Sequence, residues 1–208
     1  MPYCLLSLGC LLLFFSVLIL NIPMLSQFDL AIVSSLSQHR TATFTQISSS
    51  LSLLGSTPFA LFFATLWCFY LAWYKKYSKI LLISFALIGS MSCIWLLKYL
   101  IARPRPPEIY HLVDSYGSSF PSAHSAYAAT LACLVIFVSK QQRSYKVCVV
   151  LATLWILAMG SSRVYLGVHY PSDVMSGWGI SFIWISILYL LSNSQFCPKN
   201  KILNKHLN

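Results

Sequence analysis

The amino-acid sequence predicts an all-α, polytopic membrane protein with about six transmembrane helices packed in one bundle. Two observations carry this prediction: 58% of the 208 residues are hydrophobic, and only 9% are charged. A soluble domain carries about 25% charged residues, and this chain has no polar helices that could cover buried apolar ones. Because no repeat, low-complexity tract or linker divides the chain, we expect residues 1–208 to form a single integral-membrane domain.

Six apolar stretches are long enough to be membrane spans, since a helix needs about 17–25 residues to cross the hydrocarbon core. Apart from His124, none of them contains an ionisable side chain other than cysteine or tyrosine. The first stretch lacks the basic start and the cleavage site of a signal peptide, so we interpret it as an uncleaved helix. The predicted spans are residues 4–22, 58–74, 80–97, 122–139, 147–162 and 174–192.

The segments between these spans are of two kinds. Residues 23–57 are rich in Ser, Thr and Gln but carry apolar residues at helical intervals, which predicts one or two short helices at the outer membrane interface. Loops 75–79 and 140–146 are short enough to require antiparallel neighbours. The seven cysteines show no metal-ligand spacing, and we interpret them as apolar filling.

The distribution of charge predicts the orientation of the chain. Basic residues cluster in the two short loops and in the C-terminal tail: Lys75, Lys76, Lys79, Lys140, Arg143, Lys146, Lys199, Lys201 and Lys205. The four acidic residues fall on the opposite side: Asp29, Glu108, Asp114 and Asp173. The positive-inside rule then places both termini in the cytoplasm of a cell with this protein in its inner or plasma membrane. The basic segments fit anionic lipid headgroups, and their distribution argues against nucleic acid as a partner.

The first long outer loop, residues 98–121, collects cations. Lys98 follows the third span, where a snorkelling anchor is the alternative to a functional role. Arg103 and Arg105 alternate with prolines that stiffen the backbone. Guanidinium groups held in this way can each bind two oxygens of a phosphate. The loop therefore favours a phosphate site, with a charged surface loop as the competing interpretation of Arg103.

The fourth span opens on the sequence FPSAHS, residues 120–125. If Pro121 is the first helical residue, the N–H groups of Ser122, Ala123 and His124 have no intrahelical partners. Such a helix start attracts anions, and His124 projects from the same turn. A capping or bystander role for this histidine is the alternative.

The second outer loop has the sequence SSRVYLGVHYPSD, residues 161–173, and adds Arg163, His169 and Asp173. Asp173 is close enough in sequence to accept a hydrogen bond from one ring nitrogen of His169, which leaves the other nitrogen with an outward lone pair. A helix-start role would explain Asp173 alone. A metal site would need a third ligand that neither segment supplies, so we expect no metal.

Together these segments resemble the three-part signature of the type 2 phosphatidic acid phosphatase family. The pattern Lys-x6-Arg-Pro spans residues 98–106, Pro-Ser-Gly-His corresponds to residues 121–124, and Ser-Arg-x5-His-x3-Asp spans residues 162–173. The one departure is Ala123, which stands where glycine is usual. Its extra methyl group is expected to tighten the approach of the substrate without abolishing activity. The signature region is residues 98–173.

The resemblance implies a metal-independent lipid phosphatase without a cofactor, whose active site faces the outer membrane surface. His169 would attack phosphorus, Asp173 would orient it, and His124 would protonate the leaving oxygen and then activate water. This scheme needs a neutral His169 and a protonated His124, which predicts a bell-shaped pH dependence. The phosphate-binding residues implied are Lys98, Arg105, Ser122, Ala123 and Arg163.

The implied partner is a phosphorylated lipid within the bilayer, with undecaprenyl pyrophosphate as the leading candidate. Phosphatidylglycerol phosphate, phosphatidic acid and lipid A phosphates are the alternatives within the same activity. A phosphotransferase that passes the phosphoryl group to another lipid is a second enzymatic interpretation. A lipid-binding or transport component without catalysis is the alternative from a different functional class.

Overall fold

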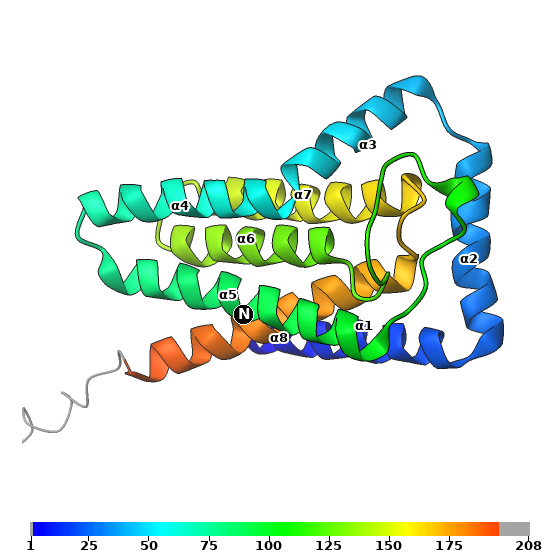
Figure 1. The fold of residues 1–208 in the computed structure, drawn as a ribbon. Coiled ribbons are helices and arrows are strands. Elements are labelled where there is room, and N and C mark those ends of the chain that lie inside the picture. The colour runs from blue at the N-terminus through cyan, green and yellow to red at the C-terminus, as the bar shows by residue number, and fades with distance from the viewer. Residues whose placement is uncertain (1, 196–208) are drawn as a thin grey trace, which may run out of the picture.

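Eight α-helices and one short 3₁₀ helix make up the regular structure of residues 2–195, the part of the chain that the computed structural model describes (Figure 1). The all-helical class predicted from the sequence is confirmed. The elements are α1 (Pro2–Asn21), α2 (Pro23–Gln38), α3 (Ala42–Leu54), α4 (Thr57–Trp73), α5 (Tyr77–Ile101), η1 (Glu108–Tyr110), α6 (Ala123–Ser139), α7 (Tyr145–Tyr165) and α8 (Pro171–Gln195).

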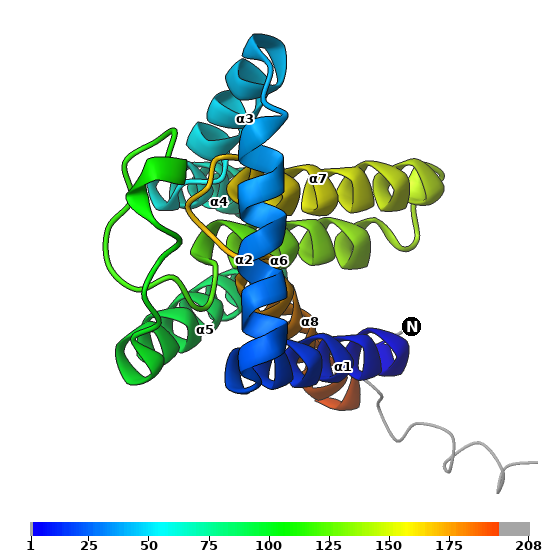
Figure 2. The ribbon, with the colours of Figure 1, turned by 90° about the vertical axis from the view of Figure 1, so that its right-hand side faces the viewer.

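The long helices run roughly along one direction, and α2 crosses one end of them (Figures 1 and 2). The loop that follows α5 and carries η1 lies at this same end, whereas the α4–α5 and α6–α7 connections lie at the other (Figure 1). The two predicted short helices in residues 23–57 are therefore α2 and α3. They place polar sequence at the end of the bundle where the chemical motifs are found.

Each predicted span is a helix, but the helices differ in their ability to cross a membrane. Within residues 2–195, four helices are long and apolar enough: α1, α5, α7 and α8. α6 is a shorter apolar helix, and α3 and α4 pass the same test only as a pair bent by 55°. By length and composition, residues 2–195 therefore contain four candidate transmembrane helices, or up to five if the bent pair is one span, and the count of six stays a prediction.

α6 is the central helix of the bundle. Its residues 125–134 are all buried, which explains why its sequence is apolar or small on every side. The Thr130 hydroxyl is satisfied inside the bundle by Ser90 on α5 at 3.0 Å and by Ser181 on α8 at 3.1 Å. Large apolar side chains such as Phe62, Phe85 and Leu157 instead lie exposed on the surrounding helices, as expected for a surface that contacts lipid.

α1 and α8 pack through glycines. A Cβ atom built at Gly9 would lie 2.8 Å from the Gly179 carbonyl oxygen, and one built at Gly179 would lie 2.8 Å from the Gly9 carbonyl oxygen. Small residues at such a crossing let two backbones approach closely, which is how helices associate within a membrane. This contact anchors α8, whose first turn carries part of the candidate site.

Candidate active site

The three sequence motifs meet at one cavity of about 520 Å³, at the end of the bundle near α2. α5, the loop after it, α6, α7 and the α7–α8 connection all contribute to its wall. Six of the eight predicted site residues line it: Lys98, Arg105, Ala123, His124, Arg163 and His169. The other two, Ser122 and Asp173, are fully buried behind this wall.

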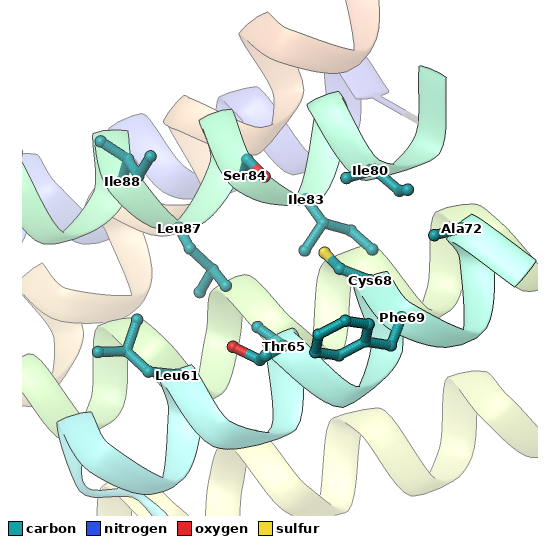
Figure 3. Close-up of a pocket in the computed structure, with 11 residues that line it drawn as sticks. Leu61, Thr65, Cys68, Phe69, Ala72, Ile80, Ile83, Ser84, Leu87 and Ile88 are labelled. Carbon is teal, nitrogen blue, oxygen red and sulfur yellow. The ribbon is translucent and has the colours of Figure 1, made fainter. Parts of the chain in front are cut away.

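A second cavity, of about 440 Å³, lies between α4 and α5 (Figure 3). Figure 3 shows its wall as mainly aliphatic, with the Cys68 sulfur and the Thr65 and Ser84 hydroxyls as its side-chain heteroatoms. Of the described residues that line it, none is charged. A phosphate needs cations or fixed donors, so the cavity with Lys98 and the two arginines is the candidate active site.

His169 lies between a carboxylate and a guanidinium. Its Nδ1 is 3.4 Å from Asp173 Oδ2, and its Nε2 is 3.4 Å from Arg105 Nη1. A carboxylate on one side and a donor on the other assign the ring proton to Nδ1 and leave the lone pair on Nε2. Burial holds the pKa of His169 at about 3, although the Asp173 carboxylate acts to raise it. The imidazole is thus a neutral base with its lone pair at the cavity.

The connection that presents His169 is a tight turn between α7 and α8. It depends on Gly167, whose φ is +76°, a backbone conformation that other residues rarely adopt. A Cβ atom at this position would lie 1.9 Å from the Tyr110 carbonyl oxygen. Glycine therefore allows the turn that carries His169 to pack against η1.

Replacing Gly167 by alanine is expected to destabilise the protein by about 2 kcal/mol or more, because the backbone strain adds to a clash with main chain. Thermal unfolding in detergent measures the change. The matched control is Gly117→Ala, since Gly117 has a φ of +68° but its Cβ would meet nothing within 4 Å. Equal losses in both variants would contradict the packing role of Gly167.

Asp173 is fully buried and accepts three further contacts besides His169. The Tyr170 backbone N–H donates to Oδ2 at 2.9 Å, the Ser119 hydroxyl donates to the same oxygen, and Arg103 Nη1 donates to Oδ1 at 2.6 Å. These partners hold the carboxylate against the imidazole. Asp173 therefore has more contacts than a simple helix-start residue would need.

The structure separates the two arginines that the sequence suggested as a pair. Arg105 lines the cavity, where its side chain donates to the carbonyl oxygens of Tyr116, Gly117 and Val168 at 2.7–3.0 Å. Arg103 instead is buried behind His169, with its guanidinium on Asp173. The expectation that both forks bind phosphate is wrong for Arg103, because a paired and buried guanidinium has no donor at the cavity.

The other two cations of the cavity are held from opposite sides. Lys98 Nζ donates to the Ser118 carbonyl oxygen at 2.5 Å, so the loop after α5 orients this ammonium group. Arg163 Nη1 donates to the Ser52 hydroxyl on α3, a contact that sequence reasoning missed. The buried Arg163 Nε has no hydrogen-bond partner among the described residues.

The start of α6 differs from the expectation based on Pro121. The helix begins at Ala123, with Ser122 as its N-cap: the Ser122 hydroxyl accepts from the Ser125 N–H at 3.5 Å. The Ser122 N–H donates to the Asp173 carbonyl oxygen at 2.9 Å. Pro121 is thus not the first helical residue, and Ser122 supports the helix start instead of facing the cavity. Ala123 and His124 line the cavity, where first-turn N–H groups lack intrahelical partners.

Fold and site define a polytopic helical membrane protein with a cation-rich pocket for an anion at one end of its bundle. The chain belongs to the PAP2 superfamily, whose family model matches residues 79–197. This confirms the family that the three motifs predicted.

Among solved structures, the transmembrane PAP2-type phosphatidylglycerolphosphate phosphatase of Bacillus subtilis is similar, with a TM-score of 0.84 and 25% identity over 92% of this chain and 97% of that one. A lipid A 4'-phosphatase of Rhizobium leguminosarum is 42% identical over 39% of this chain and 34% of its own length. An undecaprenyl-diphosphatase of Sulfolobus acidocaldarius is 30% identical over 55% of this chain and 54% of its own length. The chain thus spans about a third to a half of these curated relatives.

Proposed function

We propose that the protein is an integral-membrane lipid phosphatase that works through a phosphohistidine at His169. The observation that carries this proposal is the position of His169 Nε2. It lies at a cavity that also holds Lys98, Arg105 and Arg163, while Asp173 occupies Nδ1. A neutral nucleophile beside three cations is what transfer of a dianionic phosphoryl group requires.

In this mechanism the cations hold the phosphoryl oxygens and His169 Nε2 attacks phosphorus. The N–P bond forms as the bond to the lipid oxygen breaks, and His124 gives a proton to that oxygen. Water then attacks the phosphohistidine, His124 takes its proton, and the N–P bond breaks to release inorganic phosphate. Asp173 stabilises the positive charge on the ring, and the three cations do the work that a divalent metal does in other phosphatases.

The low pKa of His169 has a consequence for the pH profile. A histidine whose pKa is about 3 is neutral at all higher pH values, so its protonation limits kcat/KM only near pH 3. We therefore expect no acid limb from His169 between pH 4 and pH 10, so that an acid limb in this range should follow the ionisation of the substrate phosphate.

The measurement is kcat/KM from pH 4 to 10 with two substrates whose phosphate groups ionise differently. A limb of the pH profile that reflects ionisation of the substrate shifts to a different pH when the substrate is changed. An acid limb with its midpoint near 6.5 for both substrates would contradict the burial of His169.

The distribution of charge supports an outward-facing site. The acidic residues Asp29, Glu108 and Asp173 lie in or beside the elements at the α2 end of the bundle, whereas the basic loops 75–79 and 140–146 lie at the other end (Figure 1). By the positive-inside rule the α2 end faces the periplasm or the exterior. We propose this orientation for the inner or plasma membrane.

Undecaprenyl pyrophosphate is our first candidate substrate, because three cations match the high charge of a lipid diphosphate and the site would face the side on which such a lipid is exposed. Phosphatidylglycerol phosphate is the second candidate. The observation favouring it is that the structural similarity to the Bacillus subtilis enzyme covers almost all of both chains. Both substrates would keep their tails in the bilayer while the headgroup enters the cavity.

Phosphate release from purified protein in detergent, with EDTA present, tests the proposal. Undecaprenyl pyrophosphate, phosphatidylglycerol phosphate, phosphatidic acid and a lipid A phosphate are offered in parallel. We expect release from at least one lipid, unaffected by EDTA, and the preferred lipid would identify the substrate. Release only after an acceptor lipid is added would indicate a phosphotransferase. Binding of the lipids without release or transfer would support the non-catalytic alternative and overturn the proposed activity.

A further inference from the structure

A buried cluster of charges outside the cavity connects α2 to the candidate site. Asp29 on α2, Arg103 after α5 and Asp173 on α8 have 3%, 7% and 0% of their surfaces exposed. Arg103 lies between the two carboxylates, with Nη2 at 2.9 Å from Asp29 Oδ2 and Nη1 at 2.6 Å from Asp173 Oδ1. Neither Asp29 nor Arg103 lines the cavity. The site residue that Arg103 contacts is Asp173, so the two residues can affect the chemistry through that carboxylate.

The contacts of Asp29 fix Arg103 in one place. Ser172, directly before Asp173, donates its N–H to Asp29 Oδ1 at 3.1 Å and its hydroxyl to Asp29 Oδ2, and accepts from Arg103 Nη1 at 2.8 Å. The Arg103 guanidinium also lies 3.9 Å from the centre of the Tyr170 ring. With this geometry Arg103 takes Oδ1 of Asp173, and Oδ2 is left to face His169.

The charges of the cluster complement the reaction. One guanidinium between two carboxylates leaves a net single negative charge, buried beside a neutral imidazole. When His169 is phosphorylated on Nε2 and keeps its Nδ1 proton, the ring becomes positive and offsets that charge. Without the Asp29 carboxylate, the positive charge of Arg103 would be balanced by Asp173 only. The negative potential that stabilises the positive ring would then be weaker.

Stability alone does not account for this arrangement. Replacing a buried ion cluster by apolar residues is often neutral or stabilising, so such a cluster is weak evidence for a purely structural role. An aspartate on an otherwise mainly apolar and hydroxylated helix is costly to bury. Its partners all converge on one carboxylate of the site.

We propose that Asp29 is a positioning residue for catalysis, which acts through Arg103 to orient and charge the Asp173 carboxylate behind His169. The inference rests on the proposed phosphohistidine mechanism. It assigns α2, which lies outside the family motifs, an indirect part in catalysis. Lipid binding itself is expected to be independent of Asp29, because the cavity wall is unchanged.

The test is Asp29→Asn in the full-length protein, with the lipid that the wild type hydrolyses. We expect kcat to fall by about 10- to 100-fold, as is typical for a group that orients a site residue, while KM changes by less than about 3-fold. Glu108→Gln is the matched control, since it removes an exposed carboxylate from the same end of the molecule. Equal kcat values for Asp29→Asn and Glu108→Gln overturn the proposal.

A double-mutant cycle separates positioning from a general loss of order. In an Asp173→Asn background, Asp29→Asn should reduce kcat further by less than about 2-fold, because its target is gone. If the losses in kcat caused by the two substitutions multiply, Asp29 does not act through Asp173 and the proposal is overturned. If Asp29→Asn fails to fold, Ser172→Ala removes one hydroxyl from the same cluster without unpairing a charge. It should lower kcat by about 3- to 10-fold at constant KM, and a kcat equal to that of the wild type would count against the proposal.

A readout without turnover keeps this inference distinct from the proposed function. Nitrogen NMR of histidine-labelled protein, with His169 assigned by its absence in His169→Ala, reports the Nδ1–H bond to Asp173. We expect Asp29→Asn to shift this signal and Glu108→Gln to leave it in place. A shifted signal in a protein that hydrolyses no lipid would contradict the proposed function but not the contact role of Asp29. An unshifted signal in an active protein would overturn the role of Asp29 alone.

Discussion

Replacing His169 by alanine is expected to reduce kcat for phosphate release by about 10⁴-fold or more, because the reaction loses the atom that bonds to phosphorus. The variant should remain folded. Asp173, the buried group that loses a partner, keeps Arg103, Ser119 and the Tyr170 N–H as donors. The loss should therefore appear as chemistry rather than as unfolding.

Labelled phosphate gives a direct measurement of this prediction. Rapid quenching of the wild-type protein with a ³²P-labelled substrate should trap an acid-labile, base-stable phosphoprotein, and the His169 variant should trap none. His39→Ala is the matched control, because His39 is exposed at the end of α2 and its Nδ1 contacts only the Ser35 carbonyl oxygen among the described residues. A phosphoprotein of equal yield in His169→Ala would assign the nucleophile to another residue.

The helices were largely predictable because apolar runs mark their lengths. The stretch predicted at residues 122–139 is α6, Ala123–Ser139, and the stretch at 58–74 is α4, Thr57–Trp73. The central position of α6 could not be predicted in the same way. Every span is apolar on all sides, and hydrophobicity does not distinguish a neighbour made of lipid from one made of protein. The bend between α3 and α4 likewise depends on packing.

The cavity residues were predictable because their motifs are local, and the contacts behind them were not. Alternation of arginine with proline suggested that Arg103 and Arg105 act alike. A proline-rich segment favours three residues per turn, however, so residues two apart point in different directions. Asp29 lies more than 70 positions before Arg103 in sequence, and no local pattern predicts that pairing. An aspartate among the apolar residues of 23–38, in a chain with four acidic residues, was the available signal.

His124 should show its role through the choice of leaving group. Replacing it by glutamine removes the proton donor, and turnover of a lipid phosphate is expected to fall by about 10²- to 10⁴-fold. A lipid alkoxide leaves poorly without a proton, whereas nitrophenolate leaves readily. With p-nitrophenyl phosphate the first step should therefore survive in the variant, and only hydrolysis of the phosphohistidine should be slow.

A burst of nitrophenolate, about one equivalent per protein molecule, would be the kinetic sign of this split. The wild type should show no such accumulation, because His124 activates the water of the second step. His111→Gln is the matched control, since the His111 Nε2 contacts the Pro106 carbonyl oxygen and the residue does not line the cavity. Equal losses for both substrates in the His124 variant would mean that this histidine binds phosphate. The proton would then have to come from another group in the cavity, and the Lys98 ammonium group would be the first candidate.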